Sequence, residues 1–189
     1  SYENARVNLE LSWRFYQMSE VINNMKTRRS IRKYKPDMIP EDVLNRIIEA
    51  GTYAATGMGK QSPIIIAVTN KEIRDKFSKM NAEIMGVDSD PFYGAPVVLV
   101  VLADKSMPTY IYDGTLVMGN LMLEAHALGV DSCWIHRAKE EFESEEGREI
   151  LKSLGIEGDY EGIGHCILGY VDGEEPQCHP RKDNWVYRA

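Results

Sequence analysis

Three arginines and a serine lie within five positions near the start of the chain. Arg28, Arg29 and Arg32 place three guanidinium groups beside the hydroxyl of Ser30. A planar guanidinium can donate two parallel hydrogen bonds to phosphate oxygens, so this cluster is suited to binding a phosphomonoester. The alternative is a solvated basic face, and the cluster by itself leaves both interpretations open.

A second candidate is the loop of residues 54–63, whose sequence is AATGMGKQSP. Glycine lets the backbone approach a ligand closely and exposes N–H donors. The loop lacks the G-x-x-x-x-G-K-[ST] pattern of a P-loop, and no G-x-G-x-x-G follows a strand, so a Rossmann nicotinamide site is not predicted. Taken alone, such a loop is more typical of a plain connection.

The chain shows no motif for a protein nucleophile or a metal. A G-x-S-x-G elbow and an H-E-x-x-H pair are both missing. The pairs His165-Cys166 and Cys178-His179 lack C-x-x-C spacing, and the apolar neighbours of Cys166 favour packing over zinc binding. We therefore predict no metal site and assign no catalytic residue, and any redox chemistry would depend on a bound cofactor.

Composition predicts one soluble domain. The 189 residues are 43% hydrophobic with a formal net charge of -7, which argues against nucleic-acid binding. The apolar stretches are shorter than the roughly 20 residues of a membrane-spanning helix. Three cysteines, without an apolar leader near the start, indicate a reducing, cytoplasmic setting. Residues 1–17 are interpreted as an N-terminal extension, native or added, and residues 18–189 as the domain.

Periodicity predicts helices that alternate with a few strands. We expect a packed helix from Ser19, with Val21, Ile22 and Met25 on one face and the basic cluster at its end, and a second helix from Pro40 to Gly51. The run at 64–69 is apolar enough to predict a central strand.

Further along the chain the pattern predicts a helix at 71–85, a long helix at 109–128 and an acidic helix at 140–154. Strands are expected at 96–103, 130–135 and 162–171. The long helix is apolar on nearly all sides, which favours a position buried between subunits. Helices layered on such a sheet give an α/β or α+β fold.

Four segments, taken in order, resemble the nitroreductase family. They are RRSIRKY at 28–34, AATGMGKQ at 54–61, LGVDSCWI at 128–135 and PRK at 180–182. The resemblance spans about residues 19–188. It implies an α+β, three-layer sandwich with a central mixed sheet of about four to five strands, in an intertwined homodimer that holds two FMN molecules at the subunit interface.

The resemblance also implies roles for individual residues. Arg28, Ser30 and the adjacent Arg29 would hold the phosphate and ribityl chain of FMN, with Arg181 as a second phosphate ligand. Arg32 would lie by the flavin N1 and O2, where a cation favours the reduced state. The strand end that faces the flavin edge, with backbone N–H groups at N5 and O4, would comprise Trp134, Ile135, His136 and Arg137.

Other matches concern the partner's flavin and the pyrimidine ring. The loop residues would reach the cofactor of the partner subunit and are Ala55, Thr56, Gly57, Gly59 and Gln61. Asp113 and Leu116 match contacts on the partner side, and Asn81 matches an amide that hydrogen-bonds the pyrimidine ring. A proton-transfer role for His136 stays open.

Two departures from the family pattern affect these matches. Gly59, Ser62 and Pro63 stand where many relatives have Asn, Pro and Trp, so the loop amide contact is lost or replaced. His179 stands where relatives often carry Lys. FMN binding should persist, because Arg181 remains.

The function implied is ping-pong hydride transfer from NADH or NADPH, through FMN, to an electron-poor acceptor such as a nitroaromatic or a quinone. The alternatives are reductive dehalogenation on the same scaffold and a flavin-binding protein without turnover.

Overall fold

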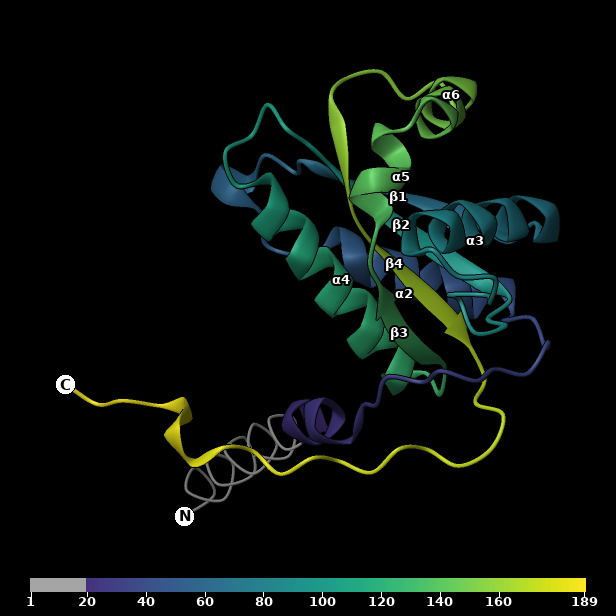
Figure 1. Cartoon of the computed structure of the whole chain (residues 1–189). Coiled ribbons are helices and arrows are strands. Elements are labelled where there is room, and N and C mark those ends of the chain that lie inside the picture. Colours follow the sequence, from purple (N-terminus) through teal and green to yellow (C-terminus); the bar gives the residue numbers. More distant parts are fainter. Residues whose placement is uncertain (1–19) are drawn as a thin grey trace, which may run out of the picture.

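The computed structural model describes residues 20–189, so the proposed N-terminal extension at 1–17 and the predicted helix start at Ser19 lie outside the described residues. Within that range the chain forms a four-stranded sheet with helices on both faces (Figure 1). The α+β, three-layer prediction is confirmed.

The sheet comprises β1 Pro63–Val68, β2 Val97–Asp104, β3 Asp131–Ile135 and β4 Tyr160–Gly169. Its spatial order is β1-β2-β4-β3, and every neighbouring pair of strands is antiparallel. We expected a mixed sheet. The parallel pairing found in the described chain is limited to an isolated bridge between Ser30 and Ser132.

The prediction that β1 is a central strand is wrong. It pairs with β2 alone and forms one edge of the sheet. Its side chains from Pro63 to Ile66 are only half-buried, and Ala67 is exposed. The fully buried strand is β2, where every residue from Val97 to Ala103 has no exposed surface. An apolar run indicates burial on both faces of a sheet but not which neighbours a strand has.

Two apolar cores lie on opposite faces of the sheet. Helices α2 Glu41–Thr52 and α4 Tyr110–Ala127 cover one face, where Ile47 and Leu121 pack in the same core as Leu99. Helices α3 Lys71–Met85, α5 Ala138–Glu143 and α6 Glu145–Ser153 cover the other, where Phe77 and Phe142 pack in the same core as Val100. The short 3₁₀ turns are η1 Gly57–Gly59 and η2 Asp183–Trp185.

The acidic segment forms two helices instead of the single helix that we expected. Ser144 separates α5 from α6, and its hydroxyl accepts a hydrogen bond from the N–H of Gly147 at 3.0 Å. A side chain at Gly147 would lie 2.0 Å from the carbonyl oxygen of Glu141, so glycine permits this close turn. Serine at a helix N-cap satisfies a free N–H of the first turn.

The N-terminal helix of the described chain lies beside α4, where the Asn24 side chain donates to the carbonyl oxygen of Leu123 at 2.9 Å, whereas the C-terminal residues extend away from the domain. Residues 20–27 are helical, but Val21, Ile22 and Met25 are 54%, 48% and 51% exposed, so the predicted packed face is not packed within a single chain. The C-terminal residues 172–189 are exposed and run back past that helix in Figure 1. None of the described helices is long and apolar enough to cross a lipid bilayer.

Candidate functional site

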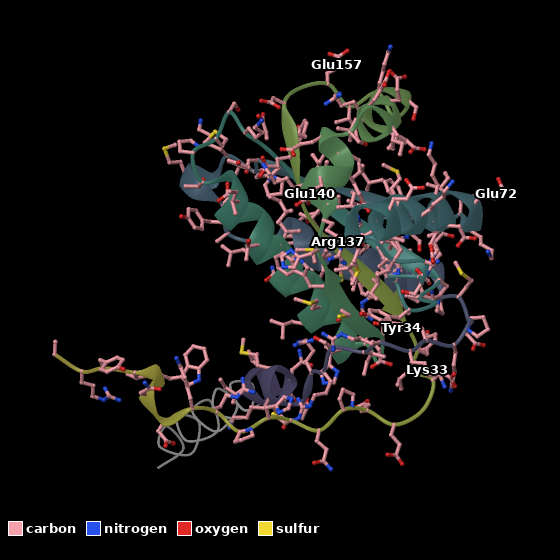
Figure 2. The ribbon with its side chains drawn as sticks, viewed as in Figure 1. Lys33, Tyr34, Glu72, Arg137, Glu140 and Glu157 are labelled. Atoms are coloured by element: carbon pink, nitrogen blue, oxygen red, sulfur yellow. The ribbon has the colours of Figure 1, made fainter. Side chains whose placement is uncertain are left out.

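The basic cluster is held against the edge of the sheet by its apolar neighbours. The N–H of Ile31 donates to the carbonyl oxygen of Ser132 at 3.1 Å, and the N–H of Lys35 donates to Tyr170 at 2.8 Å. Ile31 and Tyr34 are buried, whereas Arg32 and Lys33 are exposed. Figure 2 labels Tyr34 and Lys33 of this segment. The segment is therefore anchored beside β3 and β4 and presents its cations to the outside.

Basic side chains of this segment line a cavity of about 820 Å³, which residues 25–32 and residues 176–181 form together. Lys26, Arg28, Arg29 and Arg32 come from the N-terminal side and Arg181 from the C-terminal tail, and the lining contains no carboxylate. We call this cavity the basic hollow. Ser30 lines it too, with its hydroxyl 3.5 Å from Nη1 of Arg28. The structure thus brings together five of the predicted site residues from positions about 150 residues apart.

The guanidinium group of Arg29, unlike those of Arg28 and Arg32, bonds to backbone carbonyl oxygens at the end of helix 20–27. Its Nη1 donates to the carbonyl oxygens of Lys26 at 2.7 Å and Arg28 at 2.9 Å. The last carbonyls of a helix have no partner within the helix, and a basic side chain can satisfy them. Arg29 therefore fastens the end of helix 20–27, while Arg28 and Arg32 keep guanidinium groups available to an anion.

The second part of the site is the junction between β3 and α5. Ile135 is buried, Trp134 and Arg137 are half-buried, and His136 is exposed. Figure 2 places Arg137 at this junction. Arg137 has φ of 77°, a left-handed conformation that is uncommon for a side chain other than glycine. Such a conformation persists when surrounding contacts hold it.

Asn81 supplies those contacts. Its Nδ2 donates to the carbonyl oxygen of His136 at 2.8 Å, and its Oδ1 accepts from Nε of Arg137 at 2.8 Å. The side chain has no exposed surface, so it offers no atom to a ligand in this structure. Both polar atoms of the Asn81 amide therefore position the strand end in this structure, and its expected contact with the pyrimidine ring stays a prediction.

Asp113 holds the glycine-containing loop. Its carboxylate accepts hydrogen bonds from the N–H of Gly57 at 2.9 Å and the hydroxyls of Ser62 at 2.8 Å and Thr109 at 3.1 Å. Burial raises the pKa of Asp113, but these three bonds outweigh it and hold the pKa below its ordinary value. A side chain at Gly57 would meet Oγ1 of Thr109 at 2.2 Å. The carboxylate thus acts on the loop of its own chain.

The remaining loop residues lie outside the basic hollow. Ala55, Gly59 and Gln61 are exposed, and Thr56 and Gln61 line a separate pocket of about 370 Å³. Leu116 is 49% exposed on α4. One chain therefore does not gather these residues around its own arginines, and their predicted contact with a partner's cofactor stays a prediction.

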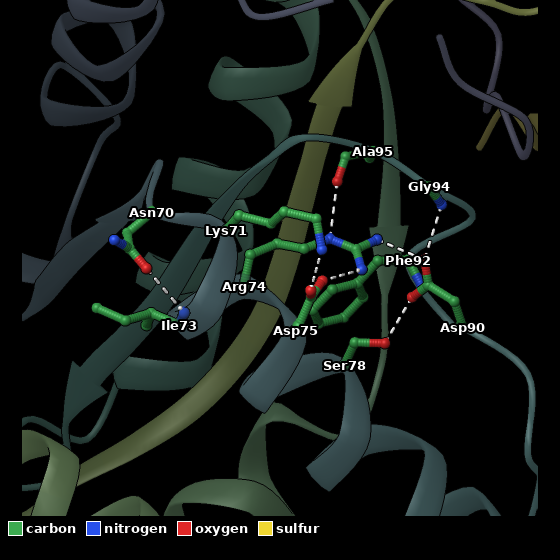
Figure 3. Close-up of polar contacts among 10 residues, drawn as sticks. All are labelled: Asn70, Lys71, Ile73, Arg74, Asp75, Ser78, Asp90, Phe92, Gly94 and Ala95. Atoms are coloured by element: carbon green, nitrogen blue, oxygen red, sulfur yellow. Dashed lines mark hydrogen bonds and ion pairs between the residues drawn. The ribbon is translucent and has the colours of Figure 1, made fainter. Parts of the chain in front are cut away.

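An ion-pair network fixes the connection between α3 and β2 (Figure 3). Arg74 donates to Asp90 at 2.5 Å and to the carbonyl oxygen of Ala95 at 2.9 Å. Asp90 also accepts from the Ser78 hydroxyl at 2.6 Å and from the N–H groups of Phe92 at 2.9 Å and Gly94 at 2.8 Å. This network therefore ties the segment between α3 and β2 firmly to the domain.

Two buried polar residues near the β3–α5 junction were not predicted as part of the site. Glu141 and His165 have no exposed surface and contact each other. Nothing in the sequence distinguishes Glu141 from the exposed acidic residues around it. Within residues 20–189 there is no group of three or more His, Cys, Asp or Glu side chains arranged to hold a metal ion.

Comparison with known proteins connects this geometry to a family. A family model described as "Nitroreductase family" matches residues 25–90 and 82–170. A protein of Methanothermobacter thermautotrophicus, named for NADH dehydrogenase or NAD(P)H nitroreductase activity, is 28% identical over 124 residues. That match covers 61% of this chain and spans 60% of the length of the relative.

Solved structures share the fold over most of the chain. A nitroreductase from Bacteroides fragilis with bound FMN is 29% identical, with a TM-score of 0.80, and the match covers 90% of this chain and 98% of that one. An iodotyrosine deiodinase bound to FMN and 3-iodo-L-tyrosine is 19% identical, with a TM-score of 0.71, and the match covers 88% of this chain and 97% of that one. The second likeness concerns the fold alone.

Proposed function

The chain belongs to the nitroreductase family, and from this premise we propose that it binds FMN and uses NADH or NADPH to reduce an electron-poor small molecule. FMN, when bound, supplies the hydride chemistry that no protein side chain can provide. The relatives support this proposal, because one is named for NAD(P)H nitroreductase activity and another was solved with FMN.

The basic hollow is the observation that carries the proposal. Its lining is cationic, contains a hydroxyl beside Arg28 and lacks any carboxylate that would repel an anion. Guanidinium groups bind phosphate through charge-assisted hydrogen bonds, which are about twice as strong as neutral ones. Arg28, Ser30 and Arg181 would hold the phosphate of FMN, and Arg32 would place its charge toward the flavin ring.

The position of the hollow relative to β3 agrees with this assignment. Ser30 is bridged to Ser132, whereas the β3–α5 junction begins at His136. Four residues of extended strand span about 13 Å. The cationic hollow and the junction therefore lie at opposite ends of one strand, which suits a ligand with a phosphate at one end and a polar ring at the other.

We further propose that turnover is ping-pong and that the active form is a homodimer. In a ping-pong cycle the nicotinamide and the acceptor, a nitroaromatic, a quinone or a similar molecule, occupy the same site in turn. The exposed loop residues Gly59 and Gln61 would complete the partner's site. The three cysteines are free, which agrees with a reducing, cytoplasmic setting.

Anaerobic reduction of the FMN-loaded protein tests the proposed function. Purified protein, reconstituted with FMN and freed of excess cofactor, should lose its visible flavin absorbance when NADH or NADPH is added. A quinone should then restore the absorbance with one equivalent for each two-electron-reduced flavin, since it becomes the hydroquinone. A nitroaromatic should restore the absorbance as well, with one equivalent or less, because its nitroso product can accept two further electrons. Free FMN under the same conditions is the control. A protein that cannot be loaded with FMN, or that is loaded but not bleached by either nicotinamide, contradicts the proposal.

A further inference from the structure

A buried acid–base pair lies directly behind the β3–α5 junction. His165 on β4 and Glu141 on α5 are fully buried, with Nε2 of His165 2.5 Å from Oε2 of Glu141. The other ring nitrogen, Nδ1, is 3.3 Å from the carbonyl oxygen of Ile135, the last residue of β3. Phe92 packs against the imidazole, with ring centroids 5.1 Å apart. The imidazole thus connects α5 to the end of β3.

The chemistry of the two contacts fixes where the protons lie. A carbonyl oxygen only accepts hydrogen bonds, so Nδ1 must carry a proton to bond with Ile135. Nε2 then either donates to an ionised Glu141 or accepts from a protonated Glu141. Both arrangements are neutral overall and both keep the proton on Nδ1. An unpaired charge at this depth would be far more costly, so Glu141 sets the tautomer of His165.

The contacts with Ile135 and His136 determine where two backbone N–H groups point. The peptide bonds are trans, so each carbonyl and the following N–H project in opposite directions. His165 draws the carbonyl of Ile135 inward and Asn81 draws that of His136 inward. The N–H groups of His136 and Arg137 therefore point away from the buried side chains. Within residues 20–189 neither N–H has a hydrogen-bond partner.

We propose that His165, oriented by Glu141, is a positioning residue that aims the N–H groups of His136 and Arg137 at the flavin ring. The inference rests on the proposed function, because the ring is the ligand these donors would meet. Asn81 supports the second donor in the same way. Preorganised backbone donors are effective because they need no rearrangement when the ligand arrives.

Paired substitutions at Glu141 test the role of the buried pair. In Glu141→Gln the amide can still donate to Nε2 and keep the proton on Nδ1, whereas Glu141→Leu removes that partner and His165→Leu removes the contact with Ile135. Cys166→Ala is the matched control, because Cys166 is the next residue of β4, is equally buried and packs in the opposite core. Thermal unfolding of each variant measures its effect on the fold.

Affinities for FMN and riboflavin are the main readout. The two leucine variants should bind both ligands about three- to tenfold more weakly and to the same extent, because the loss of one hydrogen bond affects the shared ring. The visible bands of the bound flavin should also shift, since they respond to hydrogen bonding at the ring edge. Glu141→Gln and Cys166→Ala should have the flavin affinities and the visible flavin spectrum of the wild type.

Three results would overturn the inference. The first is that the leucine variants retain wild-type affinities and spectra, and the second is that Cys166→Ala loses as much as they do. The third needs no variant: ¹⁵N-labelled histidine spectra of the wild-type protein must show a protonated Nδ1 on His165, and an unprotonated Nδ1 contradicts the proposal even if the leucine variants do not fold. Failure of wild-type protein to bind FMN would instead defeat the proposed function.

Discussion

At the scale of single residues, Arg32 makes the sharpest electrostatic prediction. A two-electron reduction places negative charge near the flavin N1, so a nearby cation favours the reduced cofactor. At an effective dielectric constant near 20, a charge about 4 Å away contributes roughly 4 kcal/mol before screening. Because Arg32 is exposed, solvent and salt screen its charge, and we take about 1.4 kcal/mol as the difference between its interactions with reduced and oxidised flavin. This difference corresponds to about 30 mV in a two-electron reduction potential.

Arg32→Ala should therefore lower the two-electron potential of bound FMN by about 30 mV, measured by anaerobic redox titration. Arg32→Lys keeps the charge and should stay close to the wild-type potential. A shift below about 10 mV for the alanine variant would show that Arg32 belongs to a solvated basic face and has no electrostatic role at the ring.

Some residues of the site could be predicted from their sequence context, and others could not. The cluster from Arg28 to Arg32 stands out because several guanidinium groups so close together suit an anion. Glu141 does not stand out, because its burial depends on α5 packing against β4, a long-range contact that no local pattern encodes. Asn81 was predicted as a ligand contact, and its hydrogen bonds to the strand end are visible only in three dimensions.

At the scale of elements, Asp90 makes the connection between α3 and β2 sensitive to acid. Burial raises the pKa of Asp90, but hydrogen bonds from Arg74, Ser78, Gly94 and Phe92 outweigh it, and the pKa lies below the ordinary value of 3.8. A carboxyl with a depressed pKa in the folded state stabilises the fold fully above its unfolded pKa. That contribution is lost as the pH falls below 3.8 through the folded pKa.

Asp90→Asn should lower the free energy of unfolding by about 2 kcal/mol near pH 7, because hydrogen bonds to a charged group are weakened. It should also reduce the loss of stability between about pH 4 and pH 2. Chemical denaturation across this range measures both effects. Asp88→Asn, at an exposed position two residues away, is the control, and equal behaviour of the two variants would contradict the role given to Asp90.

Most helices and strands could be predicted, because their periodicity and end signals are local. Gly86, in the left-handed conformation, ends α3 where the pattern predicted. The errors concern non-local features. The apolar run of β1 did not reveal that only one strand flanks it, and the break at Ser144 depends on how α6 packs against the turn after α5.

At the scale of the whole molecule, exposed apolar side chains support a dimer. Val21, Ile22 and Met25 are about half exposed on helix 20–27, and Tyr112 and Leu116 on α4 are 72% and 49% exposed. Obligate interfaces commonly bury more than about 2,000 Å², and their protomers often have no stable folded form alone. We propose that a partner chain covers helix 20–27, which would account for the exposure of a face that the sequence predicts to be packed.

Sedimentation at micromolar concentration should therefore give a mass twice that of the 21.5 kDa chain. Leu116→Glu places a charge in the predicted interface and should reduce the yield of folded, flavin-loaded dimer. Ile73→Glu is the matched control, since Ile73 is 47% exposed on α3, away from that surface. A folded monomer of the wild-type protein that carries FMN would rule out the obligate dimer.

We propose that residues 25–32 and the C-terminal tail together build a phosphate site for FMN. The most direct test of this claim compares FMN with riboflavin, which lacks the phosphate, in titrations of the wild type, Arg28→Ala and Arg181→Ala. Removal of either cation should weaken the affinity for FMN about ten- to a hundredfold, because a charge-assisted hydrogen bond contributes roughly 1.5–3 kcal/mol. The affinity for riboflavin should stay nearly unchanged. Equal losses for both ligands would contradict the claim and show that these arginines act through folding.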